Sequence, residues 1–408
     1  MYENLPKNWK KVTSVDYCAN VTDGTHDSPK PVENNGLYLL TSKNITSGEL
    51  NYKDAYCISK EDFDKINNRS FVEQYDVLYS MIGTVGESCI VKNSKIDFAI
   101  KNVGLFKFNG NELDAKWFNY YFKTDFAKNY TSQALKGSTQ KYIPLNILRK
   151  FPVPIPSTVQ EQKEIINVLD AASDMVHLRK QCIQYAQDLI PALFQEMFGN
   201  PITNEKHLPI KKIKEIANII SGGTPSTNKL EYWDGDIPWL TPKDLSGHSS
   251  IYISKGERMI SELGYKNSSA KLMPKGSILF TSRAPIGYVA ISQNELCTNQ
   301  GFKSLVPIVD IKAEYLYQIL KMVTPKIENL ASGTTFKEIS GSRMQEIQLP
   351  IAPLGQQELF AQKAIEIENY IKEQQEELKK SEDLFLSLLH HAFTGELTRH
   401  KFGGENEK

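Results

Sequence analysis

The stretch GTTFKEISGSRMQEIQLPIAPLGQQE, residues 333–358, has an earlier counterpart in the chain, GSTQKYIPLNILRKFPVPIPSTVQEQ, residues 137–162. At a constant offset of 196 residues the two stretches share seven identities in 26 positions, among them Pro154 with Pro350. Agreement at one fixed offset is typical of an internal repeat, and a repeat decides how the rest of a sequence is interpreted. Because the period is close to half of the 408 residues, we expect two similar halves.

The repeat continues on the N-terminal side, with loops of different length between the matched pieces. DGTHDSP (23–29) corresponds to GGTPSTN (222–228), and VLYSMIGTVGESCIV (77–91) corresponds to SILFTSRAPIGYVAI (277–291). Short β-branched and aromatic runs interrupted by Gly, Pro, Ser and Thr predict strands joined by tight turns. The closer apolar spacing of WFNYYF (117–122) and AEYLYQIL (313–320) predicts short helices. Each half is therefore expected to contain a mixed α+β globule.

After each globule the apolar period changes to seven. The resulting seam contains Leu169, Val176, Arg179, Ile183 and Ile190 in the first half and Ile367, Ile371, Gln374, Leu378 and Phe385 in the second. A seam sustained over five heptads predicts two long helices that form an antiparallel coiled coil. Arg179 and Gln374 occupy the midpoints of the two helices, so pairing about a pseudo-two-fold axis predicts that they meet. The alternative is that each helix packs on its own globule.

The expected fold class is α+β, with a pseudo-two-fold internal repeat. Two similar mixed α+β globules are separated by two long helices that form an antiparallel coiled coil. The expected boundaries are a first globule at 1–155, a central long helix at 156–200, a second globule at 201–352, a C-terminal long helix at 353–398 and a flexible tail at 399–408.

The net charge of zero conceals a difference between globules and helices. Residues 1–155 contain 20 Lys and Arg against 17 Asp and Glu, a balance of +3, and residues 201–350 contain 18 against 14, a balance of +4. The helical stretches 156–200 and 351–408 have balances of −3 (3 against 6) and −4 (7 against 11). A polyanion is therefore expected to bind the globules rather than the helices.

Composition and motifs exclude several classes of protein. The chain has no apolar run of membrane-spanning length and no signal-peptide core at its start, so a cytoplasmic protein is expected. Five cysteines without a CxxC pair support neither a disulfide framework nor a zinc site. A phosphate-binding GxxxxGK[ST] loop and a nucleophile elbow are also missing. We therefore predict recognition without catalysis.

The order of several phrases resembles the specificity subunit of Type I restriction–modification systems. The resemblance rests on the duplication itself and on SGGTPS, IPWLTPKDL, TSRAPIGYVAI and TNQGF in the second globule. The helix ends LFQEMFG and LLHHAFTGEL add to it. The first globule departs from this pattern, because DGTHDSP stands for GGTPS and SMIGTVG for SRAPIG.

The resemblance implies that each globule is a target recognition domain for one half of an asymmetric, split sequence in double-stranded DNA. It further implies two methyltransferase (modification) subunits and restriction (motor-nuclease) subunits as partners, with no membrane involved. S-adenosylmethionine, ATP and Mg²⁺ are then expected in the partner subunits, and no cofactor in this chain.

Polar residues in turns between apolar runs are the candidates for contacts to bases and phosphates. In the first globule these are Thr25, His26, Lys43, Ser80, Lys101, Lys136, Thr139, Gln140 and Lys141. In the second they are Thr224, Ser226, Lys243, Ser282, Arg283, Thr335, Lys337 and Arg343. Arg283 is the preferred candidate for reading a base. For each residue the alternative is a role in the turn itself.

Three other functions stay open at this point. The chain could be the recognition subunit of a related system whose partner fuses methyltransferase and nuclease. It could be a non-catalytic coiled-coil adaptor whose globules bind peptide or carbohydrate, or it could be an unrecognised nuclease.

Overall fold

A computed structural model describes residues 6, 8–33, 36–46, 48–137, 141–332 and 337–398. Residue contacts divide the chain into two compact units, of which unit 1 comprises residues 1–178 and 378–408 and unit 2 comprises residues 179–377. Two helices of 40 residues each, α6 (Val159–Phe198) and α12 (Leu354–Phe393), contribute one segment to each unit. Each unit therefore contains one globule and a segment of both helices. The predicted tail at 399–408 lies outside the described residues.

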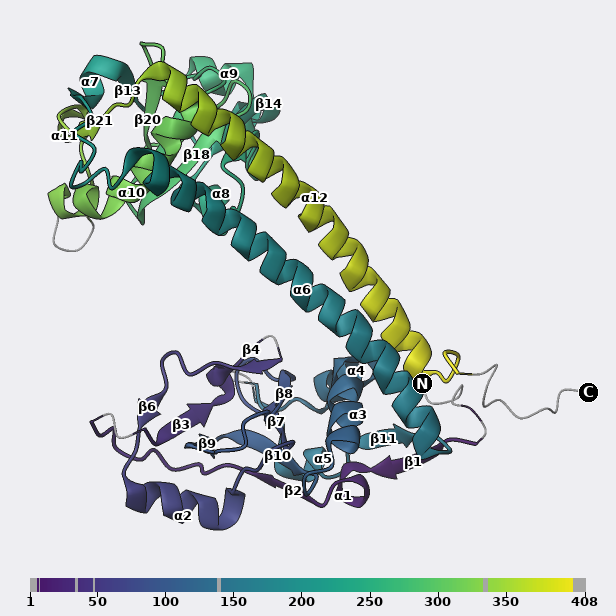
Figure 1. The fold of residues 1–408 in the computed structure, drawn as a ribbon. Coiled ribbons are helices and arrows are strands. Elements are labelled where there is room, and N and C mark those ends of the chain that lie inside the picture. Colours follow the sequence, from purple (N-terminus) through teal and green to yellow (C-terminus); the bar gives the residue numbers. More distant parts are fainter. Residues whose placement is uncertain are drawn as a thin grey trace, which may run out of the picture. The chain divides into compact units, whose positions relative to one another are not determined.

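Globule 1 contains strands and short helices as predicted. Its elements before α6 are β1 (Lys10–Thr13), α1 (Ser14–Tyr17), β2 (Asn20–Asp23), β3 (Tyr38–Thr41), η1 (Ser42–Asn44), β4 (Ile45–Thr46), β5 (Glu49–Leu50), β6 (Tyr56–Cys57), α2 (Lys60–Ser70), β7 (Val77–Ser80), β8 (Ser88–Ile90), β9 (Phe98–Lys101), β10 (Val103–Lys107), α3 (Glu112–Lys123), α4 (Asp125–Ala134), α5 (Leu145–Leu148) and β11 (Pro152–Ile155). The main sheet has the order β2-β10-β7-β8, and a second sheet has the order β6-β3-β9 (Figure 1). Strand β1 pairs with β11, which closes the globule before α6 begins.

Globule 2 repeats this plan. Its elements are β12 (Ile210–Lys212), α7 (Ile213–Ile216), β13 (Ala217–Ser221), η2 (Leu230–Tyr232), β14 (Trp233–Leu240), α8 (Pro242–Leu245), β15 (Tyr252–Ile253), β16 (Arg258–Ile260), α9 (Glu262–Lys266), β17 (Ile278–Ser282), β18 (Ile286–Ser292), β19 (Cys297–Thr298), β20 (Lys303–Pro307), α10 (Ala313–Leu330), α11 (Gly341–Gln345) and β21 (Gln348–Pro350). The main sheet has the order β13-β20-β17-β18-β15, the second sheet β16-β14-β19, and β12 pairs with β21.

The two globules therefore share one sheet topology. In each main sheet the first strand, β2 or β13, pairs with the last, β10 or β20, and the last strand pairs with the first strand of the central hairpin, β7 or β17. Each second sheet contains one parallel pair, β3 with β9 in globule 1 and β14 with β19 in globule 2. The internal repeat that the sequence predicted is thus present in the fold, and globule 2 adds only β15 to its main sheet.

One aromatic residue anchors each globule to the strand before its long helix. Trp117 of α3 donates from Nε1 to the carbonyl oxygen of Pro154 at 2.9 Å, and Tyr315 of α10 donates from Oη to the carbonyl oxygen of Pro350 at 2.8 Å. These are the two prolines that the repeat aligns. Trp117 and Tyr315 are fully buried, which removes water as a competitor for the carbonyl oxygens.

The end of a long helix packs against each of these anchors. The ring centroids of Trp117 and Phe393 lie 4.5 Å apart in unit 1, and those of Tyr315 and Phe198 lie 4.9 Å apart in unit 2. Tilted and edge-on aromatic pairs at such distances add to the free energy gained from burial. Each helix end is therefore part of a globule's hydrophobic core.

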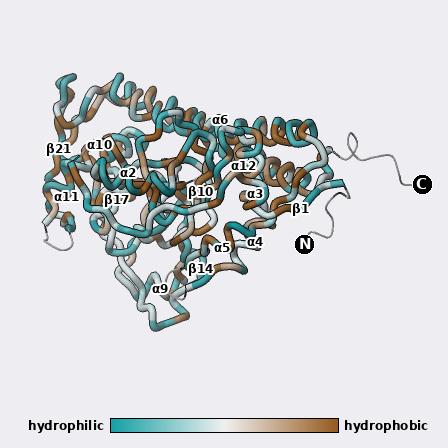
Figure 2. Tube along the Cα trace, turned by 90° about the horizontal axis from the view of Figure 1, so that it is seen from below, coloured by the Kyte–Doolittle hydropathy of each residue, from teal (hydrophilic) through white to brown (hydrophobic). Residues whose placement is uncertain are grey.

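The long helices pack together along the predicted seam. Apolar and polar residues alternate along α6 and α12 (Figure 2), and the two helices run side by side in opposite directions (Figure 1). All ten seam residues are buried or half-buried, namely Leu169, Val176, Leu378 and Phe385 in unit 1 and Arg179, Ile183, Ile190, Ile367, Ile371 and Gln374 in unit 2.

The polar layer of the seam forms as the heptad pattern predicted. Arg179 donates from Nη1 to Gln374 Oε1 at 3.1 Å, and its Nη2 lies 3.6 Å from Glu377 Oε2. A half-buried polar pair of this kind disfavours shifted registers, because a shift would leave the guanidinium among apolar side chains.

Candidate nucleic-acid interface

One edge of the main sheet of globule 1 gathers most of the candidate residues. Register pairs place Asp23 opposite Gly104 and Ser80 opposite Val103, so β2 and β7 end where β10 begins. The loop after β2, the residues before β10 and the loop between β7 and β8 therefore meet at this edge. A fourth segment joins them, because Tyr142 forms isolated bridges with Ile82 and Lys136.

Globule 2 brings the corresponding segments to the corresponding edge. Ser221 lies opposite Lys303, and Thr281 forms an isolated bridge with Phe302, so β13 and β17 end near the start of β20. Here the fourth segment is held by Glu338, which bridges Arg283 and Ser332. We call the two edges reading edge 1 and reading edge 2.

Backbone hydrogen bonds fix the same geometry at both edges. At reading edge 1 the Ile143 N–H donates to Met81 O at 3.0 Å, and at reading edge 2 the Ile339 N–H donates to Ser282 O at 3.1 Å. The pairs Lys136 with Tyr142 and Ser332 with Glu338 each exchange two backbone hydrogen bonds. Ile82 and Tyr142 in globule 1 are therefore the positional equivalents of Arg283 and Glu338 in globule 2.

At reading edge 1, Thr25, His26 and Lys101 lie together. The Asp27 N–H donates to Thr25 Oγ1 at 3.1 Å, so this hydroxyl is engaged in its own turn. The His26 ring is 64% exposed and lies between Asp23, at 3.3 Å, and Asn102, at 2.7 Å. Lys101 donates to the Ser28 hydroxyl and is half-buried. His26 is thus the candidate of this group whose side chain is most open to a ligand.

The other candidates of globule 1 lie on neighbouring loops. Lys43 is exposed on η1, which joins this edge because the Ser42 hydroxyl donates to Asn102 O at 3.1 Å. Lys136 and Lys141 are exposed on the two sides of the loop that Tyr142 closes. The candidates Thr139 and Gln140 fall outside the described residues.

Two serine candidates are placed inside the globules. Ser80 is fully buried, where its hydroxyl donates to Thr84 O at 2.5 Å and accepts from the Glu87 N–H at 2.9 Å. Ser282 is also fully buried, and its hydroxyl donates to Gly301 O at 3.1 Å. Neither hydroxyl reaches the surface. The prediction that these two serines contact DNA is therefore wrong, and both residues instead support loops.

The equivalent of Ser80 is Thr281. The Thr281 hydroxyl donates to Pro285 O at 2.8 Å and accepts from the Tyr288 N–H at 2.9 Å, with the same spacing of four and seven residues. The repeat in the sequence matched Ser80 with Ser282. The hairpin pairs Val77 with Ile90 and Ile278 with Ile291 show that the two hairpins correspond one residue earlier, so Ser80 is equivalent to Thr281.

At reading edge 2, Thr224 donates to the side chain of Gln300, so the loop after β13 is joined to the residues before β20. Ser226 is exposed, and its carbonyl oxygen accepts from Trp233 Nε1 at 3.1 Å. Lys243 is exposed on α8 and pairs with Glu257 at 2.9 Å. The hydrogen bond to that carboxylate raises the pKa of Lys243, which keeps the lysine charged.

Charged side chains surround the preferred candidate, Arg283. Its Nη1 lies 3.5 Å from Glu338 Oε2, while Lys303 Nζ lies 3.4 Å from Glu338 Oε1. The Arg283 side chain is 39% exposed and that of Lys303 is 11% exposed. Lys337 is exposed beside Glu338, whereas the candidate Thr335 falls outside the described residues.

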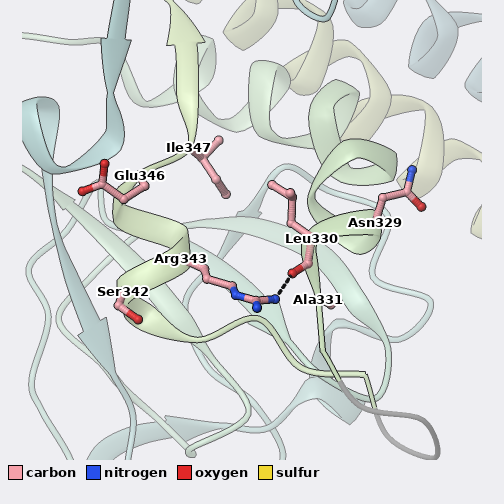
Figure 3. A pocket seen from close by; sticks show the side chains of 7 residues that line it. All are labelled: Asn329, Leu330, Ala331, Ser342, Arg343, Glu346 and Ile347. Atoms are coloured by element: carbon pink, nitrogen blue, oxygen red, sulfur yellow. Dashed lines mark hydrogen bonds between the residues drawn. The ribbon is translucent and has the colours of Figure 1, made fainter.

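The remaining candidate, Arg343, lies in a separate pocket of about 590 Å³ between the end of α10 and α11. Its Nη1 donates to Leu330 O at 2.5 Å, which caps the last turn of α10 (Figure 3). Glu346 points the other way, and hydrogen bonds from Lys212 and then Lys214 lower the pKa of Glu346 to about 2. Arg343 is thus occupied in holding two helices together.

Sequence reasoning did not include four polar residues at the reading edges, namely Asp23, Asn102, Gln300 and Glu338. Its criterion of donors and cations excluded the acids Asp23 and Glu338, whereas the amides Asn102 and Gln300 satisfied the criterion and were still not selected. The signal for Glu338 was present, because it lies in the repeated stretch and aligns with Tyr142.

Among the described residues, no group of three or more His, Cys, Asp or Glu is arranged to hold a metal ion. Among the helices of the same residues, none combines the length and the apolar character needed to cross a membrane.

A family model described as the Type I restriction modification DNA specificity domain matches residues 6–185 and 206–380. The two matches each cover one globule and the first 27 residues of the following helix (159–185 and 354–380), in agreement with the internal repeat.

Curated relatives carry related names. The MjaIX specificity subunit of Methanocaldococcus jannaschii is 48% identical over 158 residues, which are 38% of this chain and 37% of that protein. The putative MjaX specificity subunit of the same organism is 22% identical over 389 residues, covering 87% of this chain and 89% of the relative. The EcoR124I/EcoR124II specificity subunit of Escherichia coli is 26% identical over 270 residues, covering 61% and 62%.

Solved structures share the fold. The S subunit of a Type I system from M. genitalium has a TM-score of 0.55 at 16% identity, covering 95% of this chain and 99% of that one. A chain from a study of complex assembly and conformational transition of the type I R-M system has a TM-score of 0.56 at 17% identity, covering 96% and 99%.

Proposed function

The chain belongs to the Type I restriction modification DNA specificity family, and on this premise we propose that it reads an asymmetric bipartite target in double-stranded DNA with one globule per half-site. It is a specificity subunit with two target recognition domains, a class of subunit that is non-catalytic. Globules 1 and 2 are called recognition domains 1 and 2 from here on.

The observation that carries the proposal is the pair of reading edges. Both are built by equivalent segments with equivalent backbone hydrogen bonds, yet the side chains that these segments present differ. Loops on a rigid sheet can carry base contacts, because the sheet holds each side chain in place while its identity changes. Two such edges with unlike side chains favour two unlike half-sites.

The charge distribution supports the same proposal. The surplus of positive charge lies in the two recognition domains and the surplus of negative charge in the helical stretches. Surpluses of +3 and +4 give a modest attraction for phosphates. We therefore propose that partner subunits supply much of the affinity that does not depend on sequence.

We further propose that the long helices hold the partner subunits. Outside the seam, α6 exposes apolar side chains at helical spacing, which are Val168, Met175 and Leu178 in unit 1 and Tyr185 and Leu189 in unit 2. A row of this kind on each half of the helix suits a protein partner, because exposed apolar rows are costly in water. The proposed partners are two methyltransferase subunits, joined by restriction subunits.

In this proposal the chemistry takes place in the partners. S-adenosylmethionine would serve the methyltransferase subunits, and ATP with Mg²⁺ would serve the restriction subunits. The complex would act in the cytoplasm, where the chain has access to the cell's DNA.

The test is enrichment of bound sequences from a randomised duplex library by the chain co-purified with its methyltransferase subunits. Recovery of one split motif with two different halves is the expected result. Recovery without any motif would favour an adaptor that binds another ligand. Metal-dependent cutting of DNA by the chain alone would contradict a non-catalytic role.

A further inference from the structure

The Arg283, Glu338 and Lys303 side chains form a charged cluster at reading edge 2, and the identity of its central residue is unexpected. DNA carries negative charge, so a carboxylate at a DNA-facing edge makes the free energy of binding less favourable unless it also positions a group that binds DNA. Glu338 receives one cation on each carboxylate oxygen, Arg283 at 3.5 Å and Lys303 at 3.4 Å. With two cations and one anion, the cluster has a net charge of +1.

The backbone fixes where the cluster stands. Glu338 exchanges two backbone hydrogen bonds with Ser332, at 3.1 and 3.0 Å, and bridges the backbone of Arg283. The buried Thr281 hydroxyl fixes the loop that contains Arg283, because it donates to Pro285 O and accepts from the Tyr288 N–H. Arg283 and Glu338 are therefore set side by side before any ligand arrives.

Resting on the proposed function, we propose that recognition domain 2 reads a G·C base pair with the Arg283 guanidinium, and that Glu338 is the positioning residue that aims it. A guanidinium has five N–H donors in a planar fork, and one of its terminal nitrogens faces Glu338. Part of the fork stays available for two parallel hydrogen bonds. Guanine presents the matching acceptors, O6 and N7, in the major groove.

The carboxylate decides between base and phosphate as the ligand. A phosphate oxygen placed at Arg283 would lie close to Glu338, and two negative charges at such a distance repel each other. A base edge brings no such penalty. The Glu338 carboxylate thus favours a guanine edge over a phosphate as the ligand of Arg283.

Recognition domain 1 provides the matched contrast. Its equivalent positions are Ile82, which is half-buried, and Tyr142, which is 40% exposed. These side chains carry no charge and suit apolar contact with a thymine methyl group. The same two backbone positions are therefore expected to select different base pairs in the two half-sites.

The experiment compares bound motifs of the full complex with its methyltransferase subunits, using a randomised duplex library and the variants Arg283→Ala, Glu338→Gln and Glu338→Asp. Arg283→Ala should lower the preference for G·C at one position of one half-site by roughly 5- to 150-fold. Glu338→Gln should lower it partly at the same position, and Glu338→Asp, which keeps the charge, should lower it less.

Ile82→Ala is the matched control and should leave the half-site of recognition domain 2 unchanged. Unchanged preferences at all other positions show that the variants are folded. The proposal is overturned if the motif of the Arg283 and Glu338 variants equals that of the wild type. It is also overturned if Arg283→Ala weakens binding equally on all duplexes with a smaller salt dependence, which is the signature of a phosphate contact. A wild-type complex that yields no split motif would instead contradict the proposed function.

Discussion

The two recognition domains have one backbone plan and two different reading edges. Edge 1 places Ile82 beside Tyr142, while edge 2 places Arg283 beside Glu338, yet the bridges and hydrogen bonds beneath them correspond. The difference shows at which positions the identity of the side chain can vary. Backbone groups hold the loops at both edges, so the outward side chains can change without loss of the loop position.

The two domains also differ in how they are anchored, and the largest expected effect tests this difference. Trp117→Ala removes a fully buried indole that packs on Phe393 and donates to Pro154 O. We expect it to lower the free energy of unfolding of unit 1 by about 3 to 5 kcal/mol. Urea denaturation measures the loss of unfolding free energy, and hydrogen exchange of the α3 amides shows whether the loss is located in unit 1.

Tyr315→Phe is the milder counterpart in unit 2. It keeps the ring but leaves Pro350 O and the Ala352 N–H, which lies 3.2 Å from the hydroxyl, without this partner. We expect a loss of about 1 to 3 kcal/mol. Exchange that rises in both units for either variant would show that the anchors are not local to their domains.

The buried hydroxyls beneath the reading loops give the second prediction. Thr281→Val keeps the side-chain volume and removes the hydrogen bonds to Pro285 O and the Tyr288 N–H. We expect a cost of about 1 to 3 kcal/mol, confined to the β17–β18 loop. Ser80→Ala should act in the same way on the β7–β8 loop. Hydrogen exchange that rises in only one of the two loops would contradict the equivalence of the two hydroxyls, and exchange unchanged in both would contradict their role as loop supports.

The third prediction uses the carboxylate that joins α12 to recognition domain 2. Glu368 accepts from the Ser250 hydroxyl at 2.9 Å and the Ile251 N–H at 3.3 Å. Burial raises the pKa of Glu368, while these hydrogen bonds and the charges of His248 and Lys321 act in the opposite direction.

A raised pKa in the folded chain fixes the direction of the pH effect. The stabilising contribution is present below the pKa of an unfolded glutamate, about 4.3, and is lost as the pH rises through the folded pKa. Glu368→Gln cannot lose a proton, so its stability relative to the wild type should increase from pH 4 to pH 8. Denaturation midpoints across this range measure the change.

Asp170 of unit 1 is the control for this comparison. Lys116 donates to it at 2.9 Å and Tyr120 at 2.6 Å, so a full cation faces this carboxylate. Asp170→Asn should therefore be destabilising at neutral pH, because it leaves Lys116 facing a neutral amide. Unchanged stability of this variant at pH 7 would show that the ion pair does not stabilise unit 1.

The smallest expected effect concerns phosphates. Lys43 and Lys243 lie on equivalent short helices, but Lys243 is paired with Glu257. Lys43→Gln should weaken binding to all duplexes alike and lower the salt slope by about 1. Lys243→Gln should change the slope less, because Glu257 already offsets its charge. Equal slopes for both variants would show that the ion pair opens on DNA.

Much of the architecture follows from sequence periodicity. The constant offset of 196 predicted two copies of one globule, and the seven-residue period predicted two paired helices with Arg179 against Gln374. The individual contacts at the edges were less predictable. The sequence placed Ser80, Ser282 and Arg343 in polar turns, whereas the two serines end β7 and β17 and the arginine lies in α11, because a polar residue looks the same in a sequence whether it faces water, a buried carbonyl or DNA.

The sequence by itself determined the duplication, the two globules and the helical seam, because hydrophobic spacing at periods of two, 3.6 and seven follows directly from strand, helix and coiled-coil geometry. Only the tertiary structure decided which residues share an edge. The bridges of Ile82 with Tyr142 and of Arg283 with Glu338 depend on hydrogen bonds between segments far apart in the chain. Those bonds place Arg283 beside Glu338, and local residue order does not encode that neighbourhood.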